Sequence, residues 1–124
     1  MARKILIIED EEIICDILSS KLRSEGYEIS SAKDGESGLE KIKRLRPDLV
    51  LLDIIMPKMN GFFVLEQKSL DATIAKIPVI IISNSGQPVE IERAKTLGVK
   101  DWLVKADFDP EQVIDKVIQQ IGKA

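Results

Sequence analysis

Short apolar runs alternate along the chain with stretches whose apolar residues recur every three or four positions. The runs are rich in isoleucine, valine and leucine, and continuous runs of this length are typical of strands buried on both faces of a sheet. Runs of this kind lie within residues 4–8, 48–53 and 77–82, whereas residues 27–32 alternate enough to be a less buried strand and residues 100–104 are a fifth strand. The stretches between them have helical spacing, as Ile14, Leu18 and Leu22 illustrate. The pattern therefore predicts five strands, each followed by a helix.

Residues typical of helix ends mark the limits of these helices. Capping side chains or a first-turn proline indicate helix starts at Asp34, Asn60, Pro88 and Asp109. Gly26 and Gly98 follow the last apolar position of their helices, as a C-terminal glycine does. The connections are short, so the helices and strands belong to one unit.

This alternation predicts an α/β fold with a doubly wound, five-stranded parallel sheet and helices on both faces. Right-handed crossovers leave few possible topologies. We expect the strand order 2-1-3-4-5, with the topological switch point between the first and third strands. Residues 1–124 are expected to form one domain.

Composition narrows the possible functions. The 124 residues are 44% hydrophobic and carry a net charge of −3, which indicates a globular protein and argues against direct nucleic-acid binding. No apolar run approaches the roughly 18 residues needed to span a membrane. The single cysteine, Cys15, favours a reducing, cytoplasmic setting. The absence of histidine excludes Ser-His and Cys-His nucleophile pairs in their usual form, and nearly all zinc patterns.

Polar residues gather where the predicted strands end. Glu9 and Asp10 follow the first strand, Asp53 ends the third, Ser83 follows the fourth, and Lys105 follows the fifth. In the expected strand order these ends are neighbours. Three carboxylates brought together repel one another, and a divalent cation among them would let them remain ionised. Carboxylate oxygens are ligands that Mg²⁺ prefers, so we predict a magnesium site here.

The turn after the first strand argues against a nucleotide-binding protein of similar topology. Such a protein binds phosphate through backbone N–H groups at a helix N-terminus. Here residues 9–12 are Glu-Asp-Glu-Glu, which would repel a bare phosphate. We assign Glu11 and Glu12 a structural role: negative charges at the start of the following helix complement its dipole and stabilise it.

Four segments together carry a resemblance to a known family. They are ILIIEDE at residues 5–11, LLDIIMPKMNG at 51–61, IIIS at 80–83 and DWLVK at 101–105. In order and spacing they closely resemble receiver domains of two-component response regulators. The resemblance covers essentially the whole chain and implies the flavodoxin-like receiver fold.

The resemblance implies a phosphoacceptor and a metal site. Asp53 matches the aspartate that accepts a phosphoryl group. Glu9 and Asp10 match the acidic pair that holds Mg²⁺ with it, Asp10 and Asp53 directly and Glu9 through a water. The backbone carbonyl of Ile55 matches a further metal ligand. On this view the chain assists its own phosphorylation and slow dephosphorylation, and is not a turnover enzyme.

The resemblance also implies a switch and its partners. Ser83 matches the hydroxyl that binds a phosphoryl oxygen, and Lys105 matches the lysine that pairs with the acceptor carboxylate and then with the phosphoryl group. Trp102 matches an aromatic switch position on the face formed by the fourth helix, fifth strand and fifth helix. The expected partners are a histidine kinase or a histidine-containing phosphotransfer protein, and a downstream target protein. The chain is expected to be a monomer or a transient homodimer.

The sequence departs from the family pattern beside the site. Ala106 replaces the usual proline after Lys105, so we predict a trans Lys105–Ala106 bond. Asn84 is larger than the small residue usual after Ser83 and would narrow access to Asp53. Ile55 and Ser85 flank the site, and because an apolar Ile55 cannot orient water, we expect no fast self-dephosphorylation.

Three functions remain at this point. The first is a single-domain phosphoacceptor receiver. The second is a phosphorylation-independent interaction module of the same fold, which Asn84 and Ala106 alone support. The third is a hydrolase with an aspartyl-phosphate intermediate. Such a hydrolase needs an acid-base aspartate two residues after the nucleophile, and Ile55 at that position argues against it.

Overall fold

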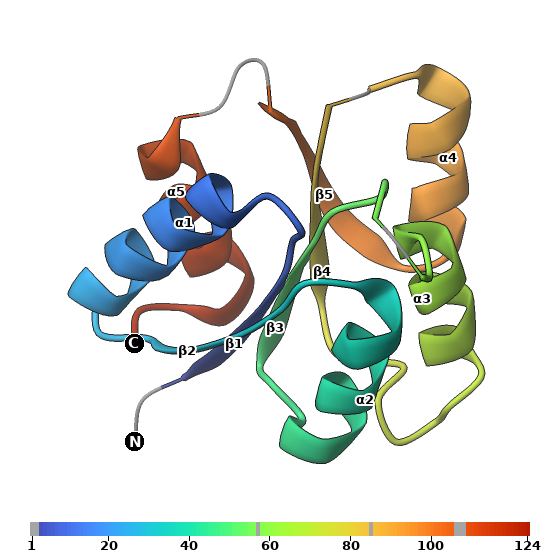
Figure 1. Ribbon diagram of the computed structural model, residues 1–124, viewed down its shortest axis with the longest axis horizontal. Helices are drawn as coiled ribbons and strands as arrows, with labels where there is room; N and C mark the ends of the chain where they lie inside the picture. Colours follow the sequence, from blue (N-terminus) through green and yellow to red (C-terminus); the bar gives the residue numbers. More distant parts are fainter. Residues whose placement is uncertain (1–2, 57, 85, 106–108) are drawn as a thin grey trace.

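A computed structural model describes residues 3–56, 58–84, 86–105 and 109–124. Five strands alternate with five helices along these residues (Figure 1). The strands are β1 Lys4–Ile8, β2 Glu28–Ala32, β3 Leu49–Leu52, β4 Val79–Ser83 and β5 Val99–Val104. The helices are α1 Glu12–Ser24, α2 Gly35–Leu45, α3 Gly61–Ser69, α4 Pro88–Thr96 and α5 Pro110–Ile121.

The five strands form one parallel sheet in the order β2-β1-β3-β4-β5. Both the fold class and the strand order predicted from the sequence are therefore confirmed. Helices α1 and α5 cover one face of the sheet, and α2, α3 and α4 cover the other (Figure 1). Because strand side chains alternate between the two faces, Leu6 and Ile8 belong to the core under α2–α4, whereas Ile5 and Ile7 belong to the core under α1 and α5.

The predicted helix caps are also confirmed. The side chains of Asp34 and Asn60 accept hydrogen bonds from the backbone N–H groups of Ser37 and Phe63, at 2.8 and 3.0 Å. Asp109 caps α5 by accepting from the N–H of Glu111 at 3.0 Å. These caps satisfy N–H groups that have no partner within the helix.

The first strand has the predicted limits, whereas the limits of the other four differ from the prediction by one or two residues. The fourth strand was expected at 77–82 but spans Val79–Ser83. The N–H of Ile77 donates to the carbonyl of Ile74 at 3.1 Å, so this residue closes a turn before the strand begins. The later end places Ser83 inside β4, where it pairs with Val104 of β5.

The register of the central strands positions the acidic residues. Ile8 of β1 lies opposite Leu52 of β3, so the residues that follow them, Glu9 and Asp53, are adjacent. The N–H of Asp53 donates to the carbonyl of Ile8 at 2.9 Å, which extends the pairing past the strand end. The switch point of the sheet therefore carries both carboxylates.

Candidate functional site: an acidic pocket with one buried lysine

The pocket contains two buried carboxylates and one that is exposed. Glu9 and Asp53 are only 3% and 4% exposed, whereas Asp10 is exposed. One carboxylate oxygen from each of the three lies within 4.8 Å of the others. The structure thus brings together the three acidic residues expected to meet at this edge of the sheet.

Lys105, at the end of β5, reaches into the same pocket with a side chain that is 5% exposed. Its Nζ donates to Asp53 Oδ2 and to Glu9 Oε2, each at 3.1 Å, and lies 3.0 Å from Glu9 Oε1. It is also 3.6 Å from Glu11 Oε2. One ammonium group is therefore shared among three carboxylates.

Burial dominates the ionisation of these groups. Burial and, to a lesser extent, the nearby charge of Asp53 raise the pKa of Glu9, and the hydrogen bonds from the Glu11 backbone and from Lys105 oppose the shift; the result is a pKa of about 7. Burial also raises the pKa of Asp53 above its ordinary value, although Lys105 opposes the shift. For Lys105, burial lowers the pKa, but the contacts with Glu9 and Asp53 raise it overall. The amine is thus held charged while the carboxylates beside it resist full ionisation.

This donor set fits a hard divalent cation. All three side chains offer oxygen, and the oxygens are close enough to share one ion. A cation would also offset the cost of two buried negative charges, which the single amine cannot balance alone. The expected contribution of the Ile55 carbonyl stays a prediction; the side chain of Ile55 is 69% exposed.

A comparison with protein families decides the classification. The family model described as "Response regulator receiver domain" matches residues 5–118. This chain belongs to the receiver domain family. The resemblance inferred from four segments is thereby confirmed over nearly the whole length.

Several receiver-containing proteins are similar in sequence. The DNA-binding dual master transcriptional regulator RpaA of Synechocystis is 36% identical over 114 residues, which cover 92% of this chain and 47% of RpaA. The probable transcriptional regulator ycf27 of Porphyridium aerugineum is 35% identical over 124 residues, covering 98% of this chain and 50% of ycf27. The chain spans about half the length of these curated relatives.

Solved receiver structures share the fold. The chemotaxis protein CheY4 of Vibrio cholerae superposes with a TM-score of 0.89 at 28% identity, covering 97% of this chain and 99% of CheY4. The receiver domain of sensor histidine kinase PA1611 from Pseudomonas aeruginosa has a TM-score of 0.87 at 23% identity, covering 99% and 100%. That domain was crystallised with a magnesium ion coordinated in its active site cleft.

The other residues singled out from the receiver pattern lie along β4 and β5. Ser83 is 1% exposed and sits at the carboxyl end of β4, beside the strand that carries Lys105. Trp102 is half-buried in β5 and pairs in register with Ile81. Its ring centroid lies 6.4 Å from that of Phe62, with the two planes inclined at 40°. The roles expected for Ser83 and Trp102 stay predictions.

Sequence reasoning missed a contact between α3 and α4 beside this tryptophan. The guanidinium of Arg93 lies 4.3 Å from the centroid of the Phe62 ring and 2.5 Å from Glu66 Oε1. Arg93 belongs to α4, and the other two residues belong to α3. Nothing in the sequence signals this contact, because it depends on how two helices distant in sequence pack together.

Among the described residues, Glu11 makes a contact with the site that the sequence analysis does not predict. Glu11 is the N-cap residue of α1, so the predicted effect on the helix dipole stays a prediction, and its carboxylate also lies 3.6 Å from Lys105 Nζ. Glu12 does lie in the first turn, as expected. Of the departures from the family pattern, Ala106 and Ser85 lie outside the described residues, and Asn84 is exposed.

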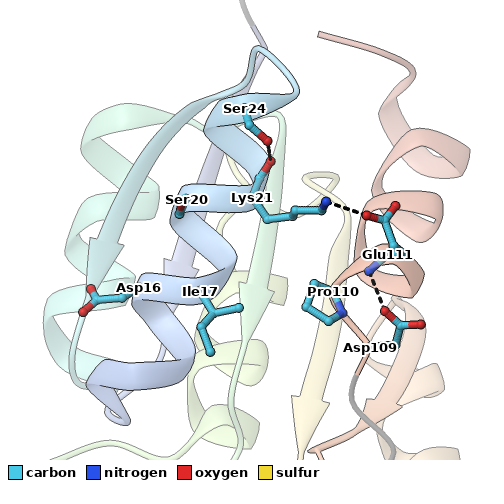
Figure 2. Close-up of a pocket in the computed structure, with 8 residues that line it drawn as sticks. All are labelled: Asp16, Ile17, Ser20, Lys21, Ser24, Asp109, Pro110 and Glu111. Atoms are coloured by element: carbon cyan, nitrogen blue, oxygen red, sulfur yellow. Dashed lines mark hydrogen bonds and ion pairs between the residues drawn. The ribbon is translucent and has the colours of Figure 1, made fainter.

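A second hollow, of about 670 Å³, lies between α1 and the start of α5 (Figure 2). Lys21 reaches across it from α1 to Glu111, with Nζ 2.5 Å from Oε1. The charged side chains of this ion pair are well exposed, unlike Glu9, Asp53 and Lys105. The acidic pocket is therefore the better candidate for chemistry.

Within the described ranges, no helix is long and apolar enough to cross a bilayer.

Proposed function

We propose that this receiver domain accepts a phosphoryl group on Asp53. The supporting observation is the position of the Asp53 carboxylate. It is buried at the end of β3 and accepts a hydrogen bond from Lys105 Nζ at 3.1 Å. One of its oxygens lies within 4.8 Å of oxygens from Glu9 and Asp10. A carboxylate next to one fixed ammonium and a cation-binding oxygen set is suited to attack an electrophilic phosphorus.

In the proposed step, an Asp53 oxygen attacks the phosphorus of a phosphohistidine or a small acyl phosphate. The new bond joins that oxygen to phosphorus, while the bond from phosphorus to the imidazole nitrogen or the acyl oxygen breaks. The 124 residues contain no histidine, so a phosphohistidine would lie outside them, on a histidine kinase or a phosphotransfer protein.

The neighbouring residues have distinct roles in this step. Glu9, Asp10 and Asp53 would hold Mg²⁺, together with the Ile55 carbonyl. The bound ion would supply neutralising charge for the phosphoryl oxygens. Lys105 would pass from the Asp53 carboxylate to a phosphoryl oxygen, and the Ser83 hydroxyl would donate to another. The response would then reach a target protein through the face formed by α4, β5 and α5, with Ser83 and Trp102 as the switch residues.

Phosphorylation can be tested by intact mass. Incubation with acetyl phosphate and Mg²⁺ is expected to add one phosphoryl group to the wild-type chain. The Asp53→Asn variant should gain none, because its amide is not a nucleophile. The matched control is Asp101→Asn, a carboxylate on β5 paired with Lys116 at 3.5 Å, which should be modified as the wild type is. An adduct that survives in Asp53→Asn would contradict the assignment, and the absence of any adduct would favour an interaction module.

A further inference from the structure

Glu11 lies at the mouth of the acidic pocket and contacts its lysine. Its carboxylate is 3.6 Å from Lys105 Nζ, and its side chain is 48% exposed. Its backbone N–H donates to Glu9 Oε2 at 3.1 Å, so the residue is tied to the pocket at both ends. Residue 11 occupies the N-cap position of α1, yet among the described residues its side chain makes no capping hydrogen bond. The Glu11 carboxylate therefore pairs with Lys105 and does not cap the backbone N–H groups at the start of α1.

The three acidic partners of Lys105 are not equivalent. Glu9 and Asp53 belong to the group whose oxygens are close enough to share a cation, and Glu11 does not belong to that group. A cation bound by that group would compete with Lys105 for Glu9 and Asp53. Glu11 would then be the partner that still retains the amine on the solvent side of the pocket.

We propose that Glu11 is a positioning residue that restrains Lys105 and slows phosphorylation of Asp53. This inference rests on the proposed phosphoacceptor function. Lys105 must turn toward a phosphoryl oxygen as the new bond forms, and an ion pair with Glu11 opposes that movement. The Glu11 charge at the entrance also repels anionic phosphoryl donors.

Removal of this charge should therefore accelerate the reaction. A unit charge about 4 Å away in a well-hydrated position changes a rate by about three- to fivefold. Because Glu11 is half-exposed, we expect the effect of Glu11→Gln to lie in this range. The same variant should bind beryllofluoride, an unreactive mimic of the phosphoryl group, about three- to fivefold more tightly.

The neighbouring glutamate provides a matched control. Glu12 lies one position further along, is 74% exposed, and pairs with Lys33 at 3.7 Å and not with Lys105. Glu12→Gln removes the same formal charge from the same helix end, so it controls for net charge and for the helix dipole. Glu11→Asp keeps a negative charge at the entrance and should remain within about twofold of the wild type.

The experiment compares these three variants with the wild type in the 124-residue chain. Phosphorylation by acetyl phosphate is followed by intact mass, and beryllofluoride affinity by Trp102 fluorescence, both with Mg²⁺. Faster phosphorylation and tighter binding in Glu11→Gln alone support the inference. Equal rates and affinities in Glu11→Gln, Glu12→Gln and the wild type would overturn it. If the wild type forms no Asp53-dependent adduct, the proposed phosphoacceptor function fails. If the adduct forms but Glu11→Gln reacts at the wild-type rate, only the inference about Glu11 fails.

Discussion

At the scale of single residues, Glu9 makes the stability of the fold depend on pH. Burial raises its pKa to about 7 from an ordinary value of 4.5, so the folded chain binds this proton more tightly than the unfolded chain does. The resulting stabilisation is present in full below about pH 4.5 and is lost as the pH rises through about 7. Lys105 and any bound cation then compensate for the ionised group.

This linkage can be measured by replacing Glu9 with glutamine, which does not titrate. In metal-free buffer, the free energy of unfolding of the wild type relative to Glu9→Gln should fall by about 3 kcal/mol between pH 4.5 and pH 7.5. Urea unfolding at several pH values gives this difference. Glu12→Gln, which removes an exposed carboxylate outside the pocket, is the control for the loss of one acidic side chain. Parallel curves for Glu9→Gln and the wild type would show that Glu9 ionises normally.

Sequence reasoning identified Glu9, Asp53 and Lys105 because strand ends in a parallel sheet have a predictable location. It did not find the contact of Glu11 with Lys105, which depends on one side-chain conformation at a helix start. Arg93 was missed for a similar reason, since its place over Phe62 follows from the packing of α4 on α3. Residues at strand ends can be grouped from the backbone topology, whereas contacts that depend on one side-chain conformation or on the packing of two helices cannot be predicted from periodicity.

At the scale of elements, the packing of α3 against the end of β3 requires a glycine. A Cβ on Gly61 would lie 2.5 Å from the carbonyl oxygen of Asp53 and 2.8 Å from the Cα of Ile54. The N–H of Gly61 also donates to the carbonyl of Ile54 at 2.7 Å. The start of α3 therefore packs directly against the backbone that carries Asp53.

Gly61→Ala should destabilise the fold by about 2–3 kcal/mol, because backbone atoms must move to admit the methyl group. It should also slow acetyl phosphate labelling, since the displaced backbone belongs to Asp53. Urea unfolding and intact mass measure the two effects. Gly98→Ala is the control: its φ of +89° costs an alanine about 1 kcal/mol, but among the described atoms none lies within 4 Å of the added Cβ. Equal losses in the two variants would mean that the close contact at Gly61 is unimportant.

Strand limits were less predictable than the strands themselves. The apolar run at 77–82 suggested a strand from Ile77, yet β4 begins two residues later and continues to Ser83. Ile77 is apolar because it packs against the core from a turn, so hydrophobicity alone does not distinguish it from a strand residue. Helix limits were more accurate, since caps such as Asp34 and Asn60 mark them directly.

At the scale of the whole molecule, an ion bound in the acidic pocket would be coupled to folding. The pocket draws its residues from β1, the turn after β1, the end of β3 and the end of β5, so it exists only when the sheet is assembled. A ligand that binds the folded chain and not the unfolded chain stabilises the fold by mass action. Mg²⁺ should therefore raise the free energy of unfolding, by about 2.7 kcal/mol at one hundred times its dissociation constant.

The stabilisation by Mg²⁺ should depend on pH and on Asp10, the exposed carboxylate among the three that would hold the ion. At pH 5 most Glu9 side chains are protonated, so Mg²⁺ must compete with a proton and the gain should shrink. Asp10→Asn removes a carboxylate that is exposed in the folded chain, so the variant should fold yet lose most of the gain at pH 7.5. Glu12→Gln should keep the full gain in stability from Mg²⁺. Thermal unfolding with Mg²⁺ and with a chelator tests all three expectations. If Mg²⁺ stabilises Asp10→Asn as much as the wild type, the ion binds elsewhere, because an ion held by Glu9, Asp10 and Asp53 must respond to the loss of one of its three carboxylates.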